Sequence, residues 1–128
     1  MTASSLLRIA GSEPEPTVLD EDHLGRMTLG DRRLEREVLE IFVRQSAIML
    51  ERITEVRPMM AAAAAHTLMG SARGIGAWRV AQAAERLEQA AGQAGREALE
   101  QAIEGLRAAS FEATAAIGAR LRETPREQ

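Results

Sequence analysis

The 128 residues of this chain are enough to bury one hydrophobic core but too few for two, so we expect a single domain. Aromatic residues make up only 2% of the chain, which disfavours a strand-rich fold, and the absence of cysteine excludes disulfide bonds and thiolate chemistry. The net charge is −3 and the 16 cationic residues are all arginines scattered along the chain, a pattern that argues against nucleic acid as a partner.

No segment of the chain is typical of membrane insertion or export. The longest uncharged run, Pro58 to Ala72, is too short and too rich in alanine to cross a bilayer. The N-terminus lacks the basic start and the long apolar stretch of a secretory signal. We therefore expect a cytoplasmic protein that does not associate with membranes.

The two ends of the chain differ in composition from its middle. Residues 1–16 are rich in Ser, Gly and Glu and include two prolines in the run Glu13-Pro14-Glu15-Pro16, a composition that predicts a disordered arm. Residues 17–122 are expected to form the ordered domain, and residues 123–128 a frayed tail.

Two helices are predicted in the first half of the domain. Asp20 can cap a short helix that continues to Leu29, after which Gly30 supplies a stop and Asp31 caps the next helix. This second helix extends from Asp31 to about Val56, because apolar residues recur there at spacings near three and four. The apolar row consists of Leu34, Val38, Ile41, Phe42, Ile48 or Met49, and Ile53.

Three further helices are predicted after residue 57. One begins at Pro58 and extends to about Arg73, another covers residues 78–91, and the last carries apolar residues at nearly heptad spacing from Leu99 to Leu121. Short links force neighbouring helices to run antiparallel, so the predicted fold is all-α, an antiparallel up-down four-helix bundle with a short leading helix. The glycines that end the first two of these helices are Gly74 and Gly76, and then Gly92 and Gly95.

Several common chemistries are excluded by what the chain lacks. It contains no lysine, and therefore no Gly-Lys-Ser/Thr loop for nucleotide phosphates. Its two histidines, His23 and His66, fall on different predicted helices without paired-ligand spacing, so we expect no metal site. We interpret His23 as a surface or capping residue and Trp78 as a plug at one end of the bundle. Glu85 and Glu88 are interpreted as solvent-facing residues without a role.

His66 is the strongest candidate for a functional residue. At about 100° per residue, the core row of its helix lies roughly 180–240° around the axis from it, so we expect the imidazole to point into solvent. That core row consists of Ala61, Leu68, Ala72 and Ile75. The residues beside His66 are small or mildly apolar and predict a docking surface for another protein. This surface comprises Met59, Ala62, Ala63, Met69, Gly70 and Arg73.

Gly70 lies one turn after His66 on the same face, although glycine in a helix interior costs about 1 kcal/mol relative to alanine. Close packing against another helix of the same chain would explain this glycine, but its direction away from the core row weakens that explanation. We expect Gly70 instead to leave room for a partner that approaches the imidazole. A neutral imidazole is nucleophilic and can accept a phosphoryl group and release it again.

A family pattern is carried by the run from His66 to Ala72, which holds the histidine and the glycine that follows it. The remaining elements of the pattern are Asp20-x-x-His23-Leu24, Gly30-Asp31, Phe42, Ile75-Gly76-Ala77 and Leu87-Glu88. Between Val18 and Leu121 the chain thus resembles the histidine-containing phosphotransfer (HPt) domains of bacterial two-component phosphorelays.

The resemblance implies a four-helix bundle that shuttles phosphoryl groups between aspartates of response-regulator receiver domains. It implies His66 as the phosphoacceptor, Gly70 as the clearance residue and structural backing from Leu68, Ala72 and Ile75. The implied partners are a receiver domain, which supplies Mg²⁺, and a sensor histidine kinase. The chain itself is then expected to be a monomer that binds no cofactor or metal and no ATP, and acts as a phosphoryl carrier rather than an enzyme.

One position departs from the family pattern. HPt domains usually carry a lysine three residues after the histidine, where its ammonium group neutralises the phosphoryl group, and this chain has Met69 there. Arg73 is the candidate replacement, because it lies about 20° from His66 and roughly 10 Å further along the axis, and helical side chains lean towards the N-terminus. A solvated surface arginine is the alternative interpretation of Arg73.

Two other functions remain open from the sequence. In the first, the missing lysine leaves His66 idle, and the protein is a non-catalytic HPt-like module that binds and regulates a receiver domain or a sensor kinase. In the second, the chain is a plain helical assembly protein whose last helix, from Leu99 to Leu121, pairs with a second copy.

Overall fold

The computed structural model describes residues 16–55, 57–93 and 95–123, and every regular element within these ranges is a helix. In chain order the helices are α2 (Glu21–Met27), α3 (Arg32–Glu55), α4 (Pro58–Ile75), α5 (Trp78–Gln93) and α6 (Arg96–Glu123). The prediction of an all-helical fold is confirmed. Apart from Pro16 and Glu123, the predicted arm and tail lie outside the described residues.

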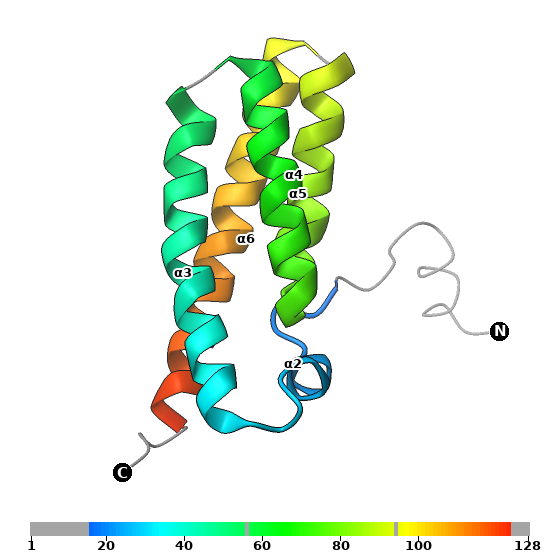
Figure 1. Ribbon diagram of the computed structural model, residues 1–128. Coiled ribbons are helices and arrows are strands. Elements are labelled where there is room, and N and C mark those ends of the chain that lie inside the picture. The colour runs from blue at the N-terminus through cyan, green and yellow to red at the C-terminus, as the bar shows by residue number, and fades with distance from the viewer. Residues whose placement is uncertain (1–15, 56, 94, 124–128) are drawn as a thin grey trace, which may run out of the picture.

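The four long helices lie side by side, and α2 lies across one end of them (Figure 1). In the view of Figure 1, α3 rises from the end at which α2 lies, α4 descends, α5 rises and α6 descends. Each long helix packs against the next one in the chain, and α6 also packs against α3. The four helices therefore enclose a single core, and α2 packs against α4.

All five helices contribute leucines to that core. Leu24 of α2, Leu39 of α3, Leu68 of α4, Leu87 of α5 and Leu106 of α6 are each at most 1% exposed. Burial of such apolar side chains is the main favourable contribution to the free energy of folding. The apolar row predicted for the last helix also faces inward, because Ala113 and Ile117 of α6 are buried in the same cluster. Three other members of this row, Leu99, Ile103 and Leu121, are partly buried against the same cluster.

The buried face of α3 differs from the row predicted for it. Phe42 and Ile53 are buried as expected, but Leu34, Ile41 and Ile48 are between 37% and 51% exposed. The buried positions that the prediction omitted are Glu35, Leu39 and Ser46. Two of these three residues are polar, so the buried face of α3 is not continuously apolar. The exposed row Leu34, Ile41 and Ile48, by contrast, is apolar at every position, and apolar periodicity therefore predicted the wrong face.

Glu35 is buried because it is paired. Its carboxylate accepts hydrogen bonds from Nε of Arg120 at 2.7 Å and from a terminal guanidinium nitrogen at 3.1 Å. Arg120 also lies 3.2 Å from the Glu21 carboxylate, and the hydrogen bond to Glu35 raises the pKa of Arg120 above its usual range. The pair joins the first turn of α3 to the last turns of α6.

Helix α4 extends two residues beyond the predicted end and contains Gly74, and α5 likewise contains Gly92. The break after α4 is at Gly76, whose φ of +83° is left-handed and whose neighbour Ala77 donates a backbone hydrogen bond to Ala72 at 2.9 Å. A Cβ at Gly76 would lie 2.9 Å from the carbonyl oxygen of Asp20. Glycine is therefore required here both by conformation and by space.

Asp20 caps α2 as predicted and also anchors it to the end of α4. One carboxylate oxygen accepts from the backbone N–H of His23 at 3.0 Å and the other from the indole N–H of Trp78 at 2.9 Å. These two hydrogen bonds, that from Trp78 most strongly, lower the pKa of Asp20. The His23 and Trp78 rings are in contact, with centroids 4.9 Å apart, and Nε2 of His23 donates to the carbonyl of Arg73 at 2.9 Å.

Candidate functional site

His66 lies near the middle of α4, on the face that points away from the core. The buried residues of this helix are Ala61, Ala65, Leu68, Met69, Ala72 and Ile75, and the His66 side chain is 65% exposed. The exposure agrees with the sequence prediction. The buried residues of α4 lie on the opposite side of the helix, and this leaves the His66 side chain in solvent.

The imidazole is held by a residue of the neighbouring helix. Nδ1 of His66 lies 3.0 Å from Oε2 of Glu88 on α5. A carboxylate can only accept a hydrogen bond, so Nδ1 carries the proton in this contact. The neutral ring then has its lone pair on Nε2, which has no hydrogen-bond partner among the residues that the structure describes.

The interpretation of Glu88 as a purely solvent-facing residue is wrong. Its side chain is only 36% exposed, and it is paired across two helices. A signal for this pairing was present in the sequence: His66 precedes Gly76 by ten residues and Glu88 follows it by twelve. Two antiparallel helices joined at a tight turn bring residues at such similar distances from the turn to the same level. Glu85, by contrast, is exposed, as expected.

Most of the predicted docking residues are accessible, with one exception. Met59 is 83% exposed, Ala63, Gly70 and Arg73 are exposed, and Ala62 is half-buried. Met69 is only 8% exposed and belongs to the core, so its assignment to the docking surface is wrong. The buried sector of α4 is wider than the row used for the prediction, because it also includes Ala65 and Met69. An unbranched methionine at the edge of that sector can turn inward and fill space there.

Gly70 has no structural partner that would explain it. A Cβ built at this position meets nothing within 4 Å, and the residue is exposed. Packing against another helix of the chain is therefore not the reason for this glycine. The open space above it is continuous with the exposed face that carries His66.

A shallow hollow extends this face towards α3. It has a volume of about 240 Å³ and lies between Met49 and Arg52 of α3 and residues of α4 that flank His66. The α4 residues that line it are Met60, Ala63, Ala64 and Thr67. Met49 and Arg52 could not be predicted at the site from the sequence, because only the packing of α3 against α4 brings them there. The accessible residues Met59, Met60, Ala63, Thr67 and Gly70 are called the docking face below.

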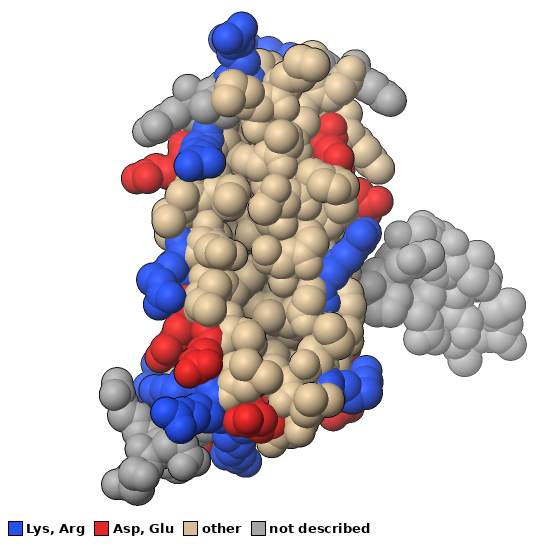
Figure 2. Space-filling model, viewed as in Figure 1, with Lys and Arg blue, Asp and Glu red and all other residues tan. Residues whose placement is uncertain are grey.

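The charge distribution agrees with a docking role for this side of the molecule. Figure 2, viewed as Figure 1 with α4 towards the reader, shows a broad area of uncharged side chains. Arginines and acidic residues lie along its margins. Surfaces of this kind, apolar or neutral in the centre with a charged rim, are typical of protein contacts.

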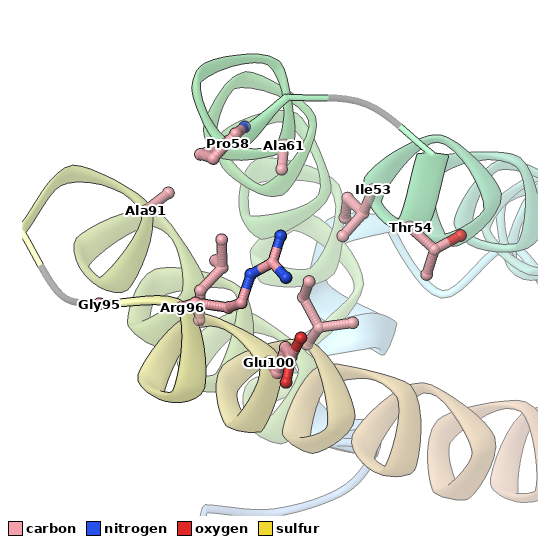
Figure 3. Close-up of a pocket in the computed structure, with 10 residues that line it drawn as sticks. Ile53, Thr54, Pro58, Ala61, Ala91, Gly95, Arg96 and Glu100 are labelled. Carbon is pink, nitrogen blue, oxygen red and sulfur yellow. The ribbon is translucent and has the colours of Figure 1, made fainter.

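A larger hollow of about 460 Å³ lies at the end of the molecule where α4 and α6 begin. Figure 3 shows the Arg96 guanidinium directed into it between Ala61 and Ile53. Neither histidine lines this hollow. His66 thus lies on an open surface and not in a cavity, and small-molecule sites are usually concave. An open surface around a reactive side chain suits a macromolecular partner.

Within the described ranges, no group of three or more His, Asp and Glu side chains is arranged to hold a metal ion. In the same part of the chain, no helix combines the length and the apolar character that crossing a membrane requires.

Comparisons with known proteins agree with this geometry. A search of the curated proteins gives no match. An X-ray structure described as a histidine-containing phosphotransfer protein from rice superposes with a TM-score of 0.74, covering 93% of this chain and 88% of the rice chain at 18% sequence identity. The two proteins therefore share a fold. The Hpt domain family model matches residues 37–120, which include His66, Gly70 and Glu88. The chain belongs to the Hpt domain family, whose members take part in phosphotransfer.

Proposed function

We propose that this protein is a cytoplasmic phosphoryl carrier of a phosphorelay, in which His66 accepts a phosphoryl group from a receiver aspartate and passes it on. The observation that carries the proposal is the exposed imidazole of His66 on the open surface of α4, in a chain of the Hpt family. The helix order and the contacts that close α3 onto α6 support an antiparallel up-down four-helix bundle as its scaffold.

The division of chemistry between the partners follows from what the chain offers. Phosphoryl transfer needs positioning and charge neutralisation more than covalent machinery from the acceptor. This chain offers a nucleophilic nitrogen on a rigid helix, and the receiver would supply Mg²⁺ and the phosphorylated aspartate. The carrier would then need no nucleotide, no metal and no cofactor of its own.

The docking face is the surface on which a receiver would bind. Met59 and Met60 provide flexible apolar contacts, and Gly70 leaves space for the partner's backbone beside the imidazole. A sensor histidine kinase that carries a receiver domain would use the same face. We propose that the chain acts as a monomer, since the apolar row of α6 packs against the core of its own bundle.

Charge neutralisation at His66 falls to Arg73, because Met69 cannot provide it. Arg73 lies two turns after His66 on the same side of α4 and is exposed. The backbone of Arg73 is fixed by α2, since the Arg73 carbonyl accepts a hydrogen bond from His23. Two unit charges about 4 Å apart attract by roughly 4 kcal/mol at an effective dielectric of 20, so a guanidinium that reaches the phosphoryl group would stabilise it substantially.

A non-catalytic module that binds and regulates a receiver or a sensor kinase is the second candidate function. The observation that favours it is the apolar, buried Met69 at the position where HPt domains usually have a lysine. Such a protein would keep the docking face and lose the transfer.

The two functions are separated by measuring transfer and binding on the same samples. The protein is incubated with a panel of receiver domains phosphorylated by acetyl phosphate in the presence of Mg²⁺, and acid-labile phosphate on the protein is followed with time. Binding to the same receivers is measured by titration calorimetry. A carrier gains label from at least one receiver, and Arg73→Ala gains it about tenfold more slowly. Binding to a receiver without any label would instead identify the regulatory module.

A further inference from the structure

The hollow of about 460 Å³ at the end of the bundle where α4 and α6 begin is lined by residues of all four long helices. Most of its wall is apolar. Apolar surface that stays open to water gives up the free energy that its burial would supply, so folding alone does not explain this hollow. The apolar residues of the wall are Ile53, Pro58, Ala61, Ala91, Leu99 and Ile103.

Arg96 directs its guanidinium into this hollow (Figure 3). Two other arginines, Arg36 and Arg107, each lie 3.5 Å from a glutamate one turn away on the same helix. Glu100 stands four residues after Arg96 and offers it the same kind of partner. Within the part of the chain that the structure describes, however, Arg96 makes no ion pair or hydrogen bond. The guanidinium therefore points towards an apolar wall without an anion beside it.

We propose that this hollow binds a small organic monocarboxylate, whose carboxylate pairs with Arg96 and whose apolar body lies against the wall. The planar fork of a guanidinium can donate two parallel hydrogen bonds to one carboxylate. Small-molecule sites typically have volumes of about 300–1,000 Å³ and combine apolar walls with a few polar groups that orient the ligand. The hollow has this size and this composition.

The charge of the ligand is argued from Glu100, whose side chain also lines the hollow. Like charges repel, so Glu100 opposes a second negative charge on a ligand that is paired with Arg96. Phosphate monoesters carry between about 1.5 and 2 negative charges at neutral pH, whereas a carboxylate carries one. A monocarboxylate is therefore the anion that fits this pair of side chains.

The proposed site is separate from the surface assigned to phosphoryl transfer. Pro58 and Ala61, the residues of α4 that line the hollow, do not belong to the docking face, and His66 does not line the hollow. A ligand bound there leaves the imidazole accessible. The proposal thus adds a binding function to the chain and does not depend on the proposed transfer.

A simpler explanation of Arg96 is that its methylene groups cover part of the apolar wall, as the stems of long charged side chains often do. The two explanations differ in what the charge does. Arg96→Met keeps an unbranched apolar side chain at this position and removes the charge. Arg122→Met is the matched control, because Arg122 is an exposed arginine of the same helix that does not line the hollow.

The test is a titration of the full chain with octanoate, followed by the ¹H–¹⁵N chemical shifts of the backbone amides. The shifts give both the affinity and the location of the ligand. Octanol has the same kind of apolar body without the charge, and octyl phosphate has it with more charge. Circular dichroism during urea unfolding verifies that both variants fold.

We expect octanoate to shift the amides of Ala61, Ala91 and Leu99 until the site is saturated. Arg96→Met should bind octanoate roughly tenfold to hundredfold more weakly, because a hydrogen-bonded charge pair is lost. Arg122→Met should bind as the wild type does. Octanol and octyl phosphate should each bind the wild type more weakly than octanoate, and the octanol comparison tests the charge without any substitution.

Absence of a saturable shift at the hollow in the wild type would overturn the proposal. Equal affinities of the wild type and Arg96→Met for octanoate would also overturn it and would leave Arg96 as a cover of the apolar wall. Tighter binding of octyl phosphate than of octanoate would contradict the assignment of a monocarboxylate. Each of these results is independent of whether His66 accepts a phosphoryl group.

Discussion

At the scale of single residues, the site combines one reactive side chain with neighbours that leave it accessible. His66 presents its imidazole on the exposed side of α4, and Gly70 keeps the space beside it open. The chain could gain stability by filling that space, because alanine is the better helix former. Retaining a glycine in the middle of an exposed helix face therefore makes sense only in relation to a partner.

Substitution of Gly70 should consequently have opposite effects on stability and on function. Gly70→Ala should raise the free energy of unfolding by about 0.5–1 kcal/mol, because the new methyl group meets nothing and helix propensity improves. The same substitution should slow phosphoryl transfer from a receiver. Urea unfolding and the transfer rate are the two measurements.

Gly105→Ala on α6 is the matched control for this prediction. Gly105 is also an exposed helical glycine with open space at its Cβ, and it lies on another helix than His66. It should gain similar stability without any loss of transfer. If Gly70→Ala transferred phosphate as fast as Gly105→Ala, the clearance role of Gly70 would be wrong.

At the scale of the elements, α4 is fixed at its C-terminal end by α2. Asp20 receives hydrogen bonds from His23 and Trp78, and His23 donates in turn to the carbonyl of Arg73. These contacts hold the end of the helix on which His66 and Arg73 lie. The sequence indicated the cap at Asp20 from its residue type and place. The Trp78 hydrogen bond joins residues 58 positions apart, and no local pattern reports such a pair.

The lowered pKa of Asp20 predicts how this end of the molecule responds to acid. A carboxyl group with a lower pKa in the folded state contributes stability that is present above its unfolded pKa, near 3.8, and is lost as the pH falls through the folded value. The wild type should therefore exceed Asp20→Asn in free energy of unfolding by a constant amount above about pH 5. The difference should narrow below about pH 4.

Urea titrations of both proteins between about pH 6 and pH 2 measure this difference. Trp78→Phe should shift the acid limb of the curve towards higher pH, because the hydrogen bond that lowers the pKa of Asp20 most strongly is gone. A difference between wild type and Asp20→Asn that does not depend on pH would contradict the assignment.

At the scale of the whole molecule, the bundle is closed by a contact between its first and last long helices. The Glu35–Arg120 pair connects α3 to α6 with two hydrogen bonds, and Glu35 is almost fully buried. Arg120→Ala should lower the free energy of unfolding by about 2–3 kcal/mol, because it leaves a buried carboxylate without its partner. Arg122→Ala, an exposed arginine on the same turn of α6, should change it by less than about 0.5 kcal/mol. If urea unfolding showed the same change in the free energy of unfolding for both substitutions, the stabilising role of the buried Glu35–Arg120 pair would be wrong.

The Glu35–Arg120 pair illustrates why the helices of this fold could be predicted from the sequence but the packing of their side chains could not. Helix positions followed from apolar periodicity, Pro58 and the glycines, which are local signals that a single sequence carries. The inner face of α3 was misread because Glu35 is buried by virtue of a partner 85 positions away. Glu88 and Met69 were misplaced for a related reason, since their environments depend on how closely α5 covers the edge of α4. The exposure of His66 could be predicted because it depends only on which face of α4 carries the apolar residues, and this can be read from one segment of the sequence.

The most direct measurement of the central claim locates the phosphoryl group on the protein. Wild type, His66→Gln and His23→Gln are each incubated with a phosphorylated receiver and Mg²⁺, and acid-labile phosphate is followed. The two substitutions remove the only two histidines of the chain one at a time, and His23 serves as the control because it is occupied in binding the end of α4. If His66 is the phosphoacceptor, label appears on the wild type and on His23→Gln and is absent from His66→Gln. Label that persists on His66→Gln would contradict the assignment of His66.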